Sequence, residues 1–447
     1  MQKPKKWSNN RRGLWRSSRS SVAPAIFVAA AFACSACFAG EYTGNLDGEY
    51  GEISKNTLDL TKQIQTSALE HLLPTLYTVK MTARAGVRYD SNINIAPEGE
   101  ADLIYTFEPT IHIGFGDVSR DLPQIGWDAP NTPVRSKARL LLSYTAMLGA
   151  FQKNDDQNYF DYNASVRGGM ILGKTRLDAS VRFQRLSTPD LDLGRRVERN
   201  VISGVVGANY RLSEKSSLVT NVSADTKDYQ DQGSDSNSVE LISLYDYRVS
   251  QKTTLGAGFG AGRINSDDGI TQSEQTYGQG LLHASWQPDK KLSAQIRGGL
   301  DFRHISPSGE NKVNPTLSAS ATYRPERNTR ISLSAVQQTT SSADSASQSV
   351  NRTRIDLTLS QILFQRLTVS ATGSWQRSSY QSTTSGSDSD QAGDQTEDYM
   401  STSLNMSYKF AQDWAIEASF NYNWNTAVDP SREFDQTLAE IRVVFEL

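Results

Sequence analysis

The chain has 447 residues, of which 37% are hydrophobic and 21% charged, and it contains only two cysteines. Its mean hydropathy of −0.51 and the lack of an apolar run of about 18 residues exclude a helical membrane protein. They do not exclude a membrane β-barrel, because barrel strands carry apolar residues only at alternate positions. Two cysteines also exclude a disulfide framework and a cysteine-rich metal site.

The net charge of −3 conceals an uneven distribution of charged residues. Residues 1–39 hold seven basic residues and no acidic one. Without them, 39 basic residues face 49 acidic ones, which gives a net charge of −10. We therefore expect no nucleic-acid partner, since phosphates require a basic face.

Residues 1–39 are predicted to be a signal peptide. The basic start precedes an apolar run, Val22–Ala33, that is too short to span a bilayer as a helix. Cys37-Phe38-Ala39 is a small-x-small cleavage site, so both cysteines would leave with the signal. A disordered basic tail is the alternative interpretation.

Residues 40–78 are predicted to be a separate periplasmic segment. Helix-like spacing runs from Ile53 to Leu76 and is broken by Pro74. A short periplasmic helix, a plug inserted into the barrel and a weakly ordered leader all fit this pattern.

From Val79 onward the hydrophobic period changes from 3.6 to 2, which predicts β-strands with one apolar and one polar face. The first strand, Val79–Asp90, places Val87 and Tyr89 on one face and Arg88 and Asp90 on the other. Similar alternation recurs around 176–183, 292–303 and 414–424.

The connections between these strands alternate between short turns and longer, acidic loops, and the hairpin repeats along the chain. Aromatic residues such as Tyr210, Tyr247 and Trp286 cluster beside the short turns, as in a membrane-interface girdle. A propeller would have shorter strands without a long apolar outer face. The pattern predicts an all-β fold, a transmembrane antiparallel up-and-down barrel of about 18 strands over residues 79–447, with short periplasmic turns and longer extracellular loops.

An even number of strands returns both barrel ends to the periplasmic side of an outer membrane in a Gram-negative envelope. The final strand alternates Ile441, Val443 and Phe445 with polar residues and ends at Leu447. Such an ending resembles the terminal strand that the barrel-assembly machinery reads. We expect that machinery and outer-membrane lipid as partners.

Two glycine-containing motifs are interpreted as structural. Gly168–Thr175 matches the P-loop pattern, but strand-like sequence flanks it on both sides, so a hairpin turn is predicted. The glycines at 256, 258, 260 and 262 share one strand face, where they would give room in the lumen or let another segment approach.

No pattern identifies catalytic residues, a cofactor or a metal site. The histidines are scattered and no G-x-S-x-G elbow occurs, so we expect no enzyme activity; a barrel-borne hydrolase remains a minor alternative. The acidic residues Asp388, Asp390 and Asp394 are interpreted as part of a solvated loop, with weak cation binding as the alternative.

Basic residues on the polar faces are the candidate pore lining. Inside a barrel they would face a wet lumen and attract anionic solutes, or else form ion pairs that only stabilise the wall. The candidates are Arg84, Arg88, Arg139, Arg167, Arg176, Arg182, Arg297, Asp301, Arg303 and Arg354.

Two stretches of the first hairpin carry a family resemblance: Gly86-Val-Arg-Tyr-Asp90-Ser-Asn92-Ile, and Ile104-Tyr-Thr-Phe-Glu-Pro109-Thr-Ile. They resemble the outer-membrane β-barrel porins associated with exopolysaccharide export and exosortase systems. The resemblance implies a barrel in a polysaccharide setting, with polysaccharide export components as further partners, and it supplies no site residues.

We therefore expect a porin-like channel for an anionic or neutral saccharide or exopolysaccharide. A barrel with a structural or adhesion role is the principal alternative.

Overall fold

The structure is a computed structural model that describes residues 77–116, 138–230, 233–306, 308–346, 348–382 and 395–447. The predicted signal peptide, residues 40–76 of the periplasmic segment and the acidic loop around Asp390 lie outside the described residues. All described strands belong to one compact unit, Thr75–Leu447. Within the described ranges, no helix is both long and apolar enough to cross a membrane.

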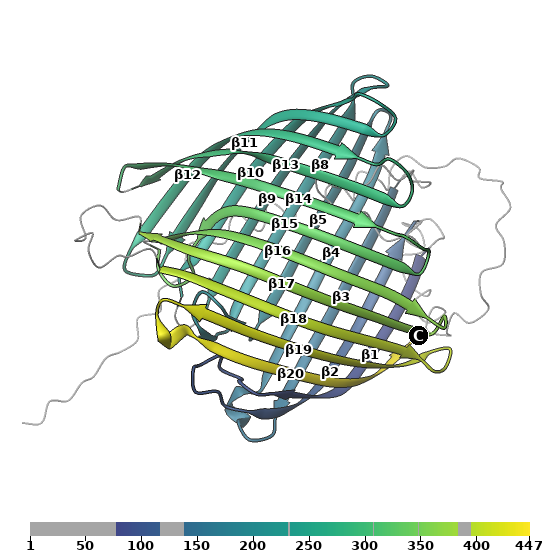
Figure 1. Cartoon of the computed structure of the whole chain (residues 1–447), viewed down its shortest axis with the longest axis vertical. Coiled ribbons are helices and arrows are strands. Elements are labelled where there is room, and N and C mark those ends of the chain that lie inside the picture. Colours follow the sequence, from purple (N-terminus) through teal and green to yellow (C-terminus); the bar gives the residue numbers. More distant parts are fainter. Residues whose placement is uncertain (1–76, 117–137, 231–232, 307, 347, 383–394) are drawn as a thin grey trace, which may run out of the picture. The chain divides into compact units, whose positions relative to one another are not determined.

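One 18-stranded antiparallel sheet makes up this unit, and it is accompanied by one small hairpin, β6–β7, and two single-turn 3-10 helices (Figure 1). The bounds are β1 (Tyr77–Asp90), β2 (Asp102–Phe115), β3 (Ala138–Phe151), η1 (Asp155–Gln157), β4 (Tyr159–Leu172), β5 (Thr175–Leu186), β6 (Pro189–Asp190), β7 (Arg195–Arg196), β8 (Arg199–Arg211), β9 (Ser216–Tyr229), β10 (Asp235–Arg248), β11 (Thr253–Asp267), β12 (Gln272–Trp286), β13 (Leu292–Ser306), β14 (Glu310–Tyr323), β15 (Thr329–Ser341), β16 (Gln348–Leu363), β17 (Leu367–Ser382), β18 (Gln395–Lys409), β19 (Trp414–Ala427), η2 (Pro430–Arg432) and β20 (Phe434–Glu446).

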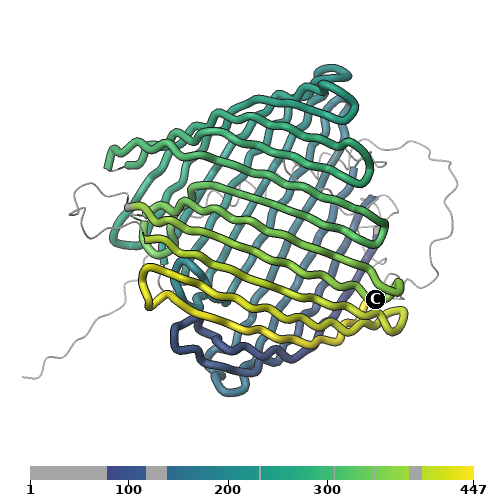
Figure 2. Tube along the Cα trace, viewed as in Figure 1, coloured from purple at the N-terminus to yellow at the C-terminus, as the bar shows by residue number. Residues whose placement is uncertain are grey.

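The sheet closes on itself between its first and last strands. β1 pairs with β20 from Thr82 opposite Glu446 to Asp90 opposite Leu438, and Figure 2 shows the two ends of the chain's colour range side by side. Met81 and Leu447 exchange backbone hydrogen bonds of 3.1 and 2.8 Å at the end of this seam. Closure leaves no unpaired edge, so the predicted up-and-down barrel of 18 strands is confirmed. Its first strand begins at Tyr77, two residues before the predicted Val79.

The barrel has two different rims. Seven connections of two to five residues, such as 173–174 and 212–215, lie at the end where the chain terminates, and we call it the short-turn rim. The opposite end, the long-loop rim, carries nine connections, including 91–101 and 187–198. The connection of residues 116–137, between β2 and β3, joins strand ends at the short-turn rim, and apart from Gly116 it lies outside the described residues. Gly173 adopts a φ of +57° in the two-residue turn between β4 and β5, which confirms that the P-loop match is a hairpin turn.

Large apolar side chains cover the outside of the barrel. Leu282, Phe302 and Phe259 expose 70, 55 and 55% of their surface, as no soluble protein of this size would do over a whole sheet. Beside the short turns, exposed aromatic side chains form the predicted girdle: Tyr210, Tyr247, Trp286, Tyr323, Tyr408 and Trp414. A closed sheet with this exterior is stable only in lipid.

The glycine-rich face of β11 points into the barrel and is covered by side chains from the neighbouring strands. Leu244 of β10 lies against Gly258, and the ring of Tyr277 of β12 lies against Gly262. Ile242 and Leu244 pack with Leu281 into a small buried cluster on this wall. The glycines therefore leave room for side chains of the two adjacent strands.

Candidate functional site

The connection between β5 and β8, residues Ser187–Glu198, folds over the lumen instead of extending away from the barrel, and we call it the latch loop. Its root is fixed by Ser187, whose backbone N–H and hydroxyl donate to Asp161 of β4 at 3.0 and 2.7 Å. The short strands β6 and β7 pair within it, and Gly194 makes their turn with a φ of +62°. The loop therefore has a defined structure of its own.

The tip of the latch loop reaches the opposite wall of the barrel. β5 and β8 are the fifth and sixth strands of the ring, whereas β16 and β17, which contact the tip, are the fourteenth and fifteenth. Seven strands lie between the two pairs in either direction around the ring, so the loop crosses the lumen along a diameter. Asp192 is six residues beyond Leu186, the last residue of β5. Six residues of extended chain span at most about 20 Å. Long side chains from the far wall complete the crossing.

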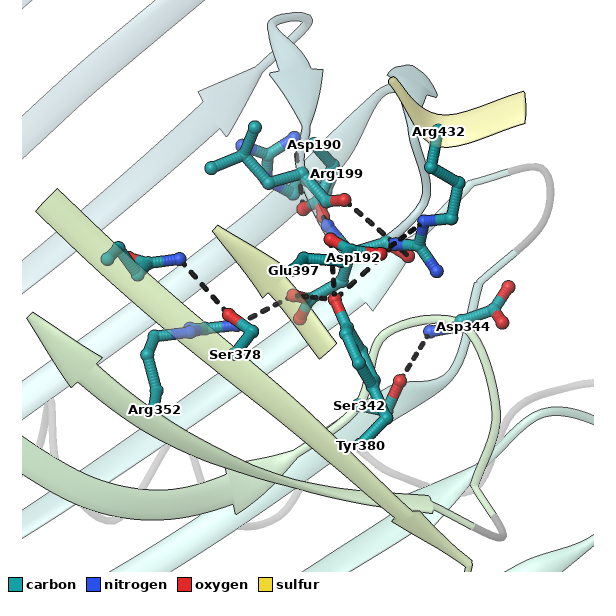
Figure 3. A network of polar contacts seen from close by, with 12 residues as sticks. Asp190, Asp192, Arg199, Ser342, Asp344, Arg352, Ser378, Tyr380, Glu397 and Arg432 are labelled. Atoms are coloured by element: carbon teal, nitrogen blue, oxygen red, sulfur yellow. Dashed lines mark hydrogen bonds and ion pairs between the residues drawn. The ribbon is translucent and has the colours of Figure 1, made fainter. Parts of the chain in front are cut away.

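Asp192 is the main contact of the tip (Figure 3). Its carboxylate accepts a hydrogen bond of 2.7 Å from Arg352 of β16 and one of 3.1 Å from the hydroxyl of Tyr380 of β17. The side chain of Asp192 is 11% exposed and that of Arg352 is 24% exposed. The pair is largely shielded from water, so losing one partner would leave a costly unpaired charge behind.

Arg432 of η2 holds the tip of the latch loop by hydrogen bonds to its backbone. Its guanidinium donates to the carbonyl of Leu191 at 2.9 Å and also to that of Asp192. It also pairs with Glu397 of β18 at 2.7 Å and lies 5.2 Å from the ring centre of Tyr380. Burial acts to lower the pKa of Arg432, but attraction to Tyr380, Glu397 and other acidic neighbours outweighs it and raises the pKa, so the guanidinium stays charged.

A second arginine holds the near side of the latch loop. The Arg196 guanidinium lies 4.9 Å from the ring centres of both Phe151 and Tyr159, which belong to β3 and β4. Burial lowers the pKa of Arg196. Such cation–π contacts contribute about 1–2 kcal/mol each when desolvated.

Other connections at this rim also fold inward. Val197 of the latch loop packs with Tyr229 and with Ala343 from the connection between β15 and β16. The carbonyl of Ala343 accepts a hydrogen bond of 2.7 Å from the backbone N–H of Ser234, and the backbone N–H of Ala346 donates one of 3.2 Å to the carboxylate of Asp268. Together with the latch loop, these connections contact one another across the lumen at the long-loop rim.

Arg84 and Arg88, two of the predicted pore-lining residues, lie in an ion-pair ladder across the β1–β20 seam. Arg84 pairs with Glu108 at 3.0 Å and with Glu417 at 3.6 Å, and Arg88 pairs with Glu440 at 3.2 Å. Arg442 of the last strand joins Glu417 at 3.0 Å. The ladder links β19, β20, β1 and β2, so these arginines fasten the closure of the barrel.

Other predicted residues also form ion pairs along the wall. Arg139 and Arg176 both reach Asp178, at 3.6 and 2.7 Å. Arg354 pairs with Asp356 at 2.8 Å but leaves 52% of its side chain exposed, so it still presents charge to the lumen.

Arg303 is almost fully buried, in contrast to Arg354. It pairs with Asp301 at 3.0 Å, donates to Gln275 at 2.7 Å and lies 4.6 Å from the ring centre of Tyr277. Because only 1% of its side chain is exposed, Arg303 packs the wall and presents little charge to a solute.

Arg167 and Arg182 differ from the rest because neither has an acidic partner among the described residues. Arg182 lies opposite Ser165 and Arg167 opposite Ser180, which makes the two arginines diagonal neighbours on the inner face of β4 and β5. Arg297 lies on the inner face of β13, opposite His283 and Ser318.

Reasoning from the sequence did not identify the latch residues Asp192, Arg352, Tyr380 and Arg432. Asp192 is 160 residues from Arg352 and 188 from Tyr380, and no local pattern predicts that an outer loop turns inward. The only available signal was the density of charges in Ser187–Glu198, which an external loop would share.

The described residues contain parts of a hydrolase triad but in separate places. The hydroxyl of Ser143 lies 2.8 Å from Nδ1 of His112, and Asp246 lies 3.0 Å from Nδ1 of His283. Within the same described ranges, no three acidic, histidine or cysteine side chains converge on a possible metal position.

A closed antiparallel barrel with an even number of strands, an apolar exterior and a polar lumen defines an outer-membrane β-barrel of the porin class, located in the outer membrane of a Gram-negative envelope. Residues 310–447 match the family model described as "Putative beta-barrel porin 2". The resemblance to a porin family is thus confirmed over the last part of the barrel, and the association with exopolysaccharide stays a prediction.

Solved structures similar to the chain are also large barrels. Pseudomonas aeruginosa OpdK, crystallised with vanillate, is 12% identical over 83% of this chain and 99% of its own, with a TM-score of 0.40. P. aeruginosa OccK2, in complex with glucuronate, is 13% identical over 83% and 98%, with a TM-score of 0.41. The FrpB iron transporter of Neisseria meningitidis is 9% identical over 80% and 63%, with a TM-score of 0.42. No curated protein matches the sequence. At these similarities the neighbours carry no argument about the function of this chain.

Proposed function

We propose that the protein is a channel for a hydrophilic saccharide, anionic or neutral, and that the latch loop closes its outer mouth. The observation that carries this proposal is the crossing of the lumen by Ser187–Glu198, held by Asp192 against Arg352, Tyr380 and Arg432. A barrel of this size leaves an aqueous lumen unless a segment fills it. A segment held by a few polar contacts at its tip can be released more readily than a packed core.

The preference for anionic solutes rests on Arg167 and Arg182. They lie on the lumen face without an acidic partner among the described residues, whereas most of the other candidate arginines take part in ion pairs. Fixed positive charge on a lumen wall attracts anions and repels cations. Polysaccharide export components and the barrel-assembly machinery, the latter acting on β20, are the partners that this proposal includes; it includes no catalytic step.

Planar-bilayer recording of the purified full chain tests the proposal. We expect a small conductance with brief openings and a preference for anions. No conductance at any voltage, for the wild type and for a variant with a severed latch, would overturn the channel function.

A structural or adhesion barrel is the second candidate, and the seam ladder is the observation that favours it. Arg84, Glu417 and Arg442 stabilise the wall whether or not solute passes. This candidate predicts a barrel that stays closed to ions even when the contacts of Asp192 are removed.

A further inference from the structure

The two rims of the barrel carry opposite charge. The seven short turns, each counted with one adjoining residue on either side, hold 11 basic and 4 acidic residues, and the connection between β2 and β3 at the same rim, residues 116–137, adds three of each sign, which gives 14 basic and 7 acidic residues. The nine connections at the long-loop rim, counted in the same way, hold 5 basic and 20 acidic residues. A solute that bears several negative charges is therefore attracted to the short-turn rim and repelled from the other.

A repeated dipeptide places four of these basic residues on the lumen side of the wall. Four strands end in a tyrosine followed directly by a basic residue: Tyr210-Arg211, Tyr247-Arg248, Tyr323-Arg324 and Tyr408-Lys409. Each of these tyrosines is exposed on the outer face, in the girdle. Because neighbouring residues of a strand point to opposite faces, Arg211, Arg248 and Lys409, the last residues of their strands, point to the lumen side. Arg324 directly follows the last residue of β14, and we place it on the same side by continuing the alternation.

The backbone then brings like charges together. The N–H of Arg211 donates to the carbonyl of Lys174 at 2.9 Å, and that of Arg248 to Lys215 at 2.7 Å. The same bond joins Arg324 to Lys291 at 2.7 Å and Lys409 to Arg366 at 2.9 Å. Each turn thus sets one basic residue beside another from the preceding turn. Adjacent like charges destabilise a sheet unless counter-charges neutralise them.

The four lumen-side residues Arg211, Arg248, Arg324 and Lys409, which we call the inner ring, have no acidic partner among the described residues. They come from the sixth, eighth, twelfth and sixteenth strands, so they are spread around more than half of the mouth. All four are exposed. The sequence thus places at this mouth an excess of positive charge, and these four residues form no ion pair with the described part of the protein.

We propose that the inner ring is a binding site for a polyanion, a flexible chain bearing carboxylate or phosphate groups that enters the lumen from the short-turn side. This proposal deepens the proposed function and rests on it for the passage that follows capture. Anionic lipid headgroups are a weaker fit, because the tyrosines that precede the residues of the inner ring face the membrane, whereas the basic residues of the ring face the lumen. In this class of barrel the short turns face the periplasm, so capture occurs on the periplasmic side.

Binding of a labelled polygalacturonate chain, a linear polymer with one carboxylate per sugar, tests the site. The full chain in zwitterionic nanodiscs should raise the fluorescence anisotropy of this polymer and leave that of neutral dextran unchanged. At about 0.5 M salt, where the screening length falls below ~5 Å, the binding should be lost.

Two matched variants identify the residues. R211Q/R248Q/R324Q/K409Q should weaken polygalacturonate binding by about tenfold or more, because four charges around one mouth act together. K153Q/K227Q/R263Q/R377Q removes four charges near the long-loop rim and should bind as the wild type does. R211K/R248K/R324K/K409R keeps the charge and should retain binding, which separates charge from folding.

Three results would overturn the proposal: equal affinity of the inner-ring variant and the wild type, equal binding of dextran, or loss of polymer binding when the nanodiscs contain anionic lipid. The last would assign the ring to headgroups. Conductance distinguishes the two proposals. If the protein binds the polymer but never conducts, the inner ring stands as a binding site and the channel function is rejected.

Discussion

Individual side chains decide whether a charge in the lumen acts on solute or on the wall. Arg167 and Arg303 were both candidates on the polar face of a strand, yet only Arg303 is enclosed by Asp301, Gln275 and Tyr277. Alternation predicts the face on which an arginine lies but not which neighbour it meets, since the neighbour comes from another strand.

Charge reversal at the exposed pair tests this distinction. R167E/R182E should shift the reversal potential toward cation selectivity, because it converts two positive charges on the lumen face into negative ones. R303Q should leave the reversal potential unchanged while lowering stability, since it removes a buried charge from Asp301. An unchanged potential in R167E/R182E would exclude these arginines from the conducting path.

The contacts of Asp192 allow a graded test of the latch. R352Q removes the charge that pairs with Asp192, and Y380F removes one hydrogen bond to it. We expect about 1–3 kcal/mol of latch stability to be lost in R352Q and about 1 kcal/mol in Y380F. Channel openings in bilayer recordings should therefore be frequent in R352Q and intermediate in Y380F. Openings as rare as in the wild type for both would argue against a latch.

At the scale of elements, strands were predictable and the inward loops were not. The period-2 pattern, the short turns and the aromatic girdle all arise from local sequence, so the strand number and the face of each residue follow from it. The latch loop contacts strands on the far side of the ring, and its partners are distant in sequence, so its position depends on the assembled barrel.

The glycines of β11 allow a test of how tightly the wall is packed. A Cβ at Gly258 would collide with the backbone of Ser243 and Leu244, whereas one at Gly280 of the neighbouring strand would meet nothing within 4 Å. G258V should therefore destabilise the barrel by about 1–3 kcal/mol, and G280V should not. Urea unfolding of the two variants in detergent measures the difference; equal midpoints would contradict the packing of Leu244 over Gly258.

The whole molecule depends on the seam at which its two ends meet. Arg442 connects the last strand to Glu108 and Glu417, which lie on β2 and β19. R442Q should lower the temperature at which the barrel unfolds, because it leaves these two carboxylates to share a single cation, Arg84. Heat-dependent migration on SDS gels measures this, with K153Q as a surface control; an unchanged transition would show that the backbone pairing of β1 and β20 suffices.

The charge difference between the rims is also a property of the whole molecule. The net charge of the chain conceals it, and neither rim is contiguous in sequence. Only the barrel topology gathers the short turns at one end and the acidic loops at the other.

The central claim is that Ser187–Glu198 closes the outer mouth of the barrel. Single-channel conductance of the full chain, compared with that of a variant in which residues 188–197 are replaced by a glycine–serine segment of equal length, tests it most directly. We predict a several-fold larger and steadier conductance for the variant, because the segment that crosses the lumen loses its contacts with Arg352, Tyr380 and Arg432. The same conductance in both proteins would contradict the claim.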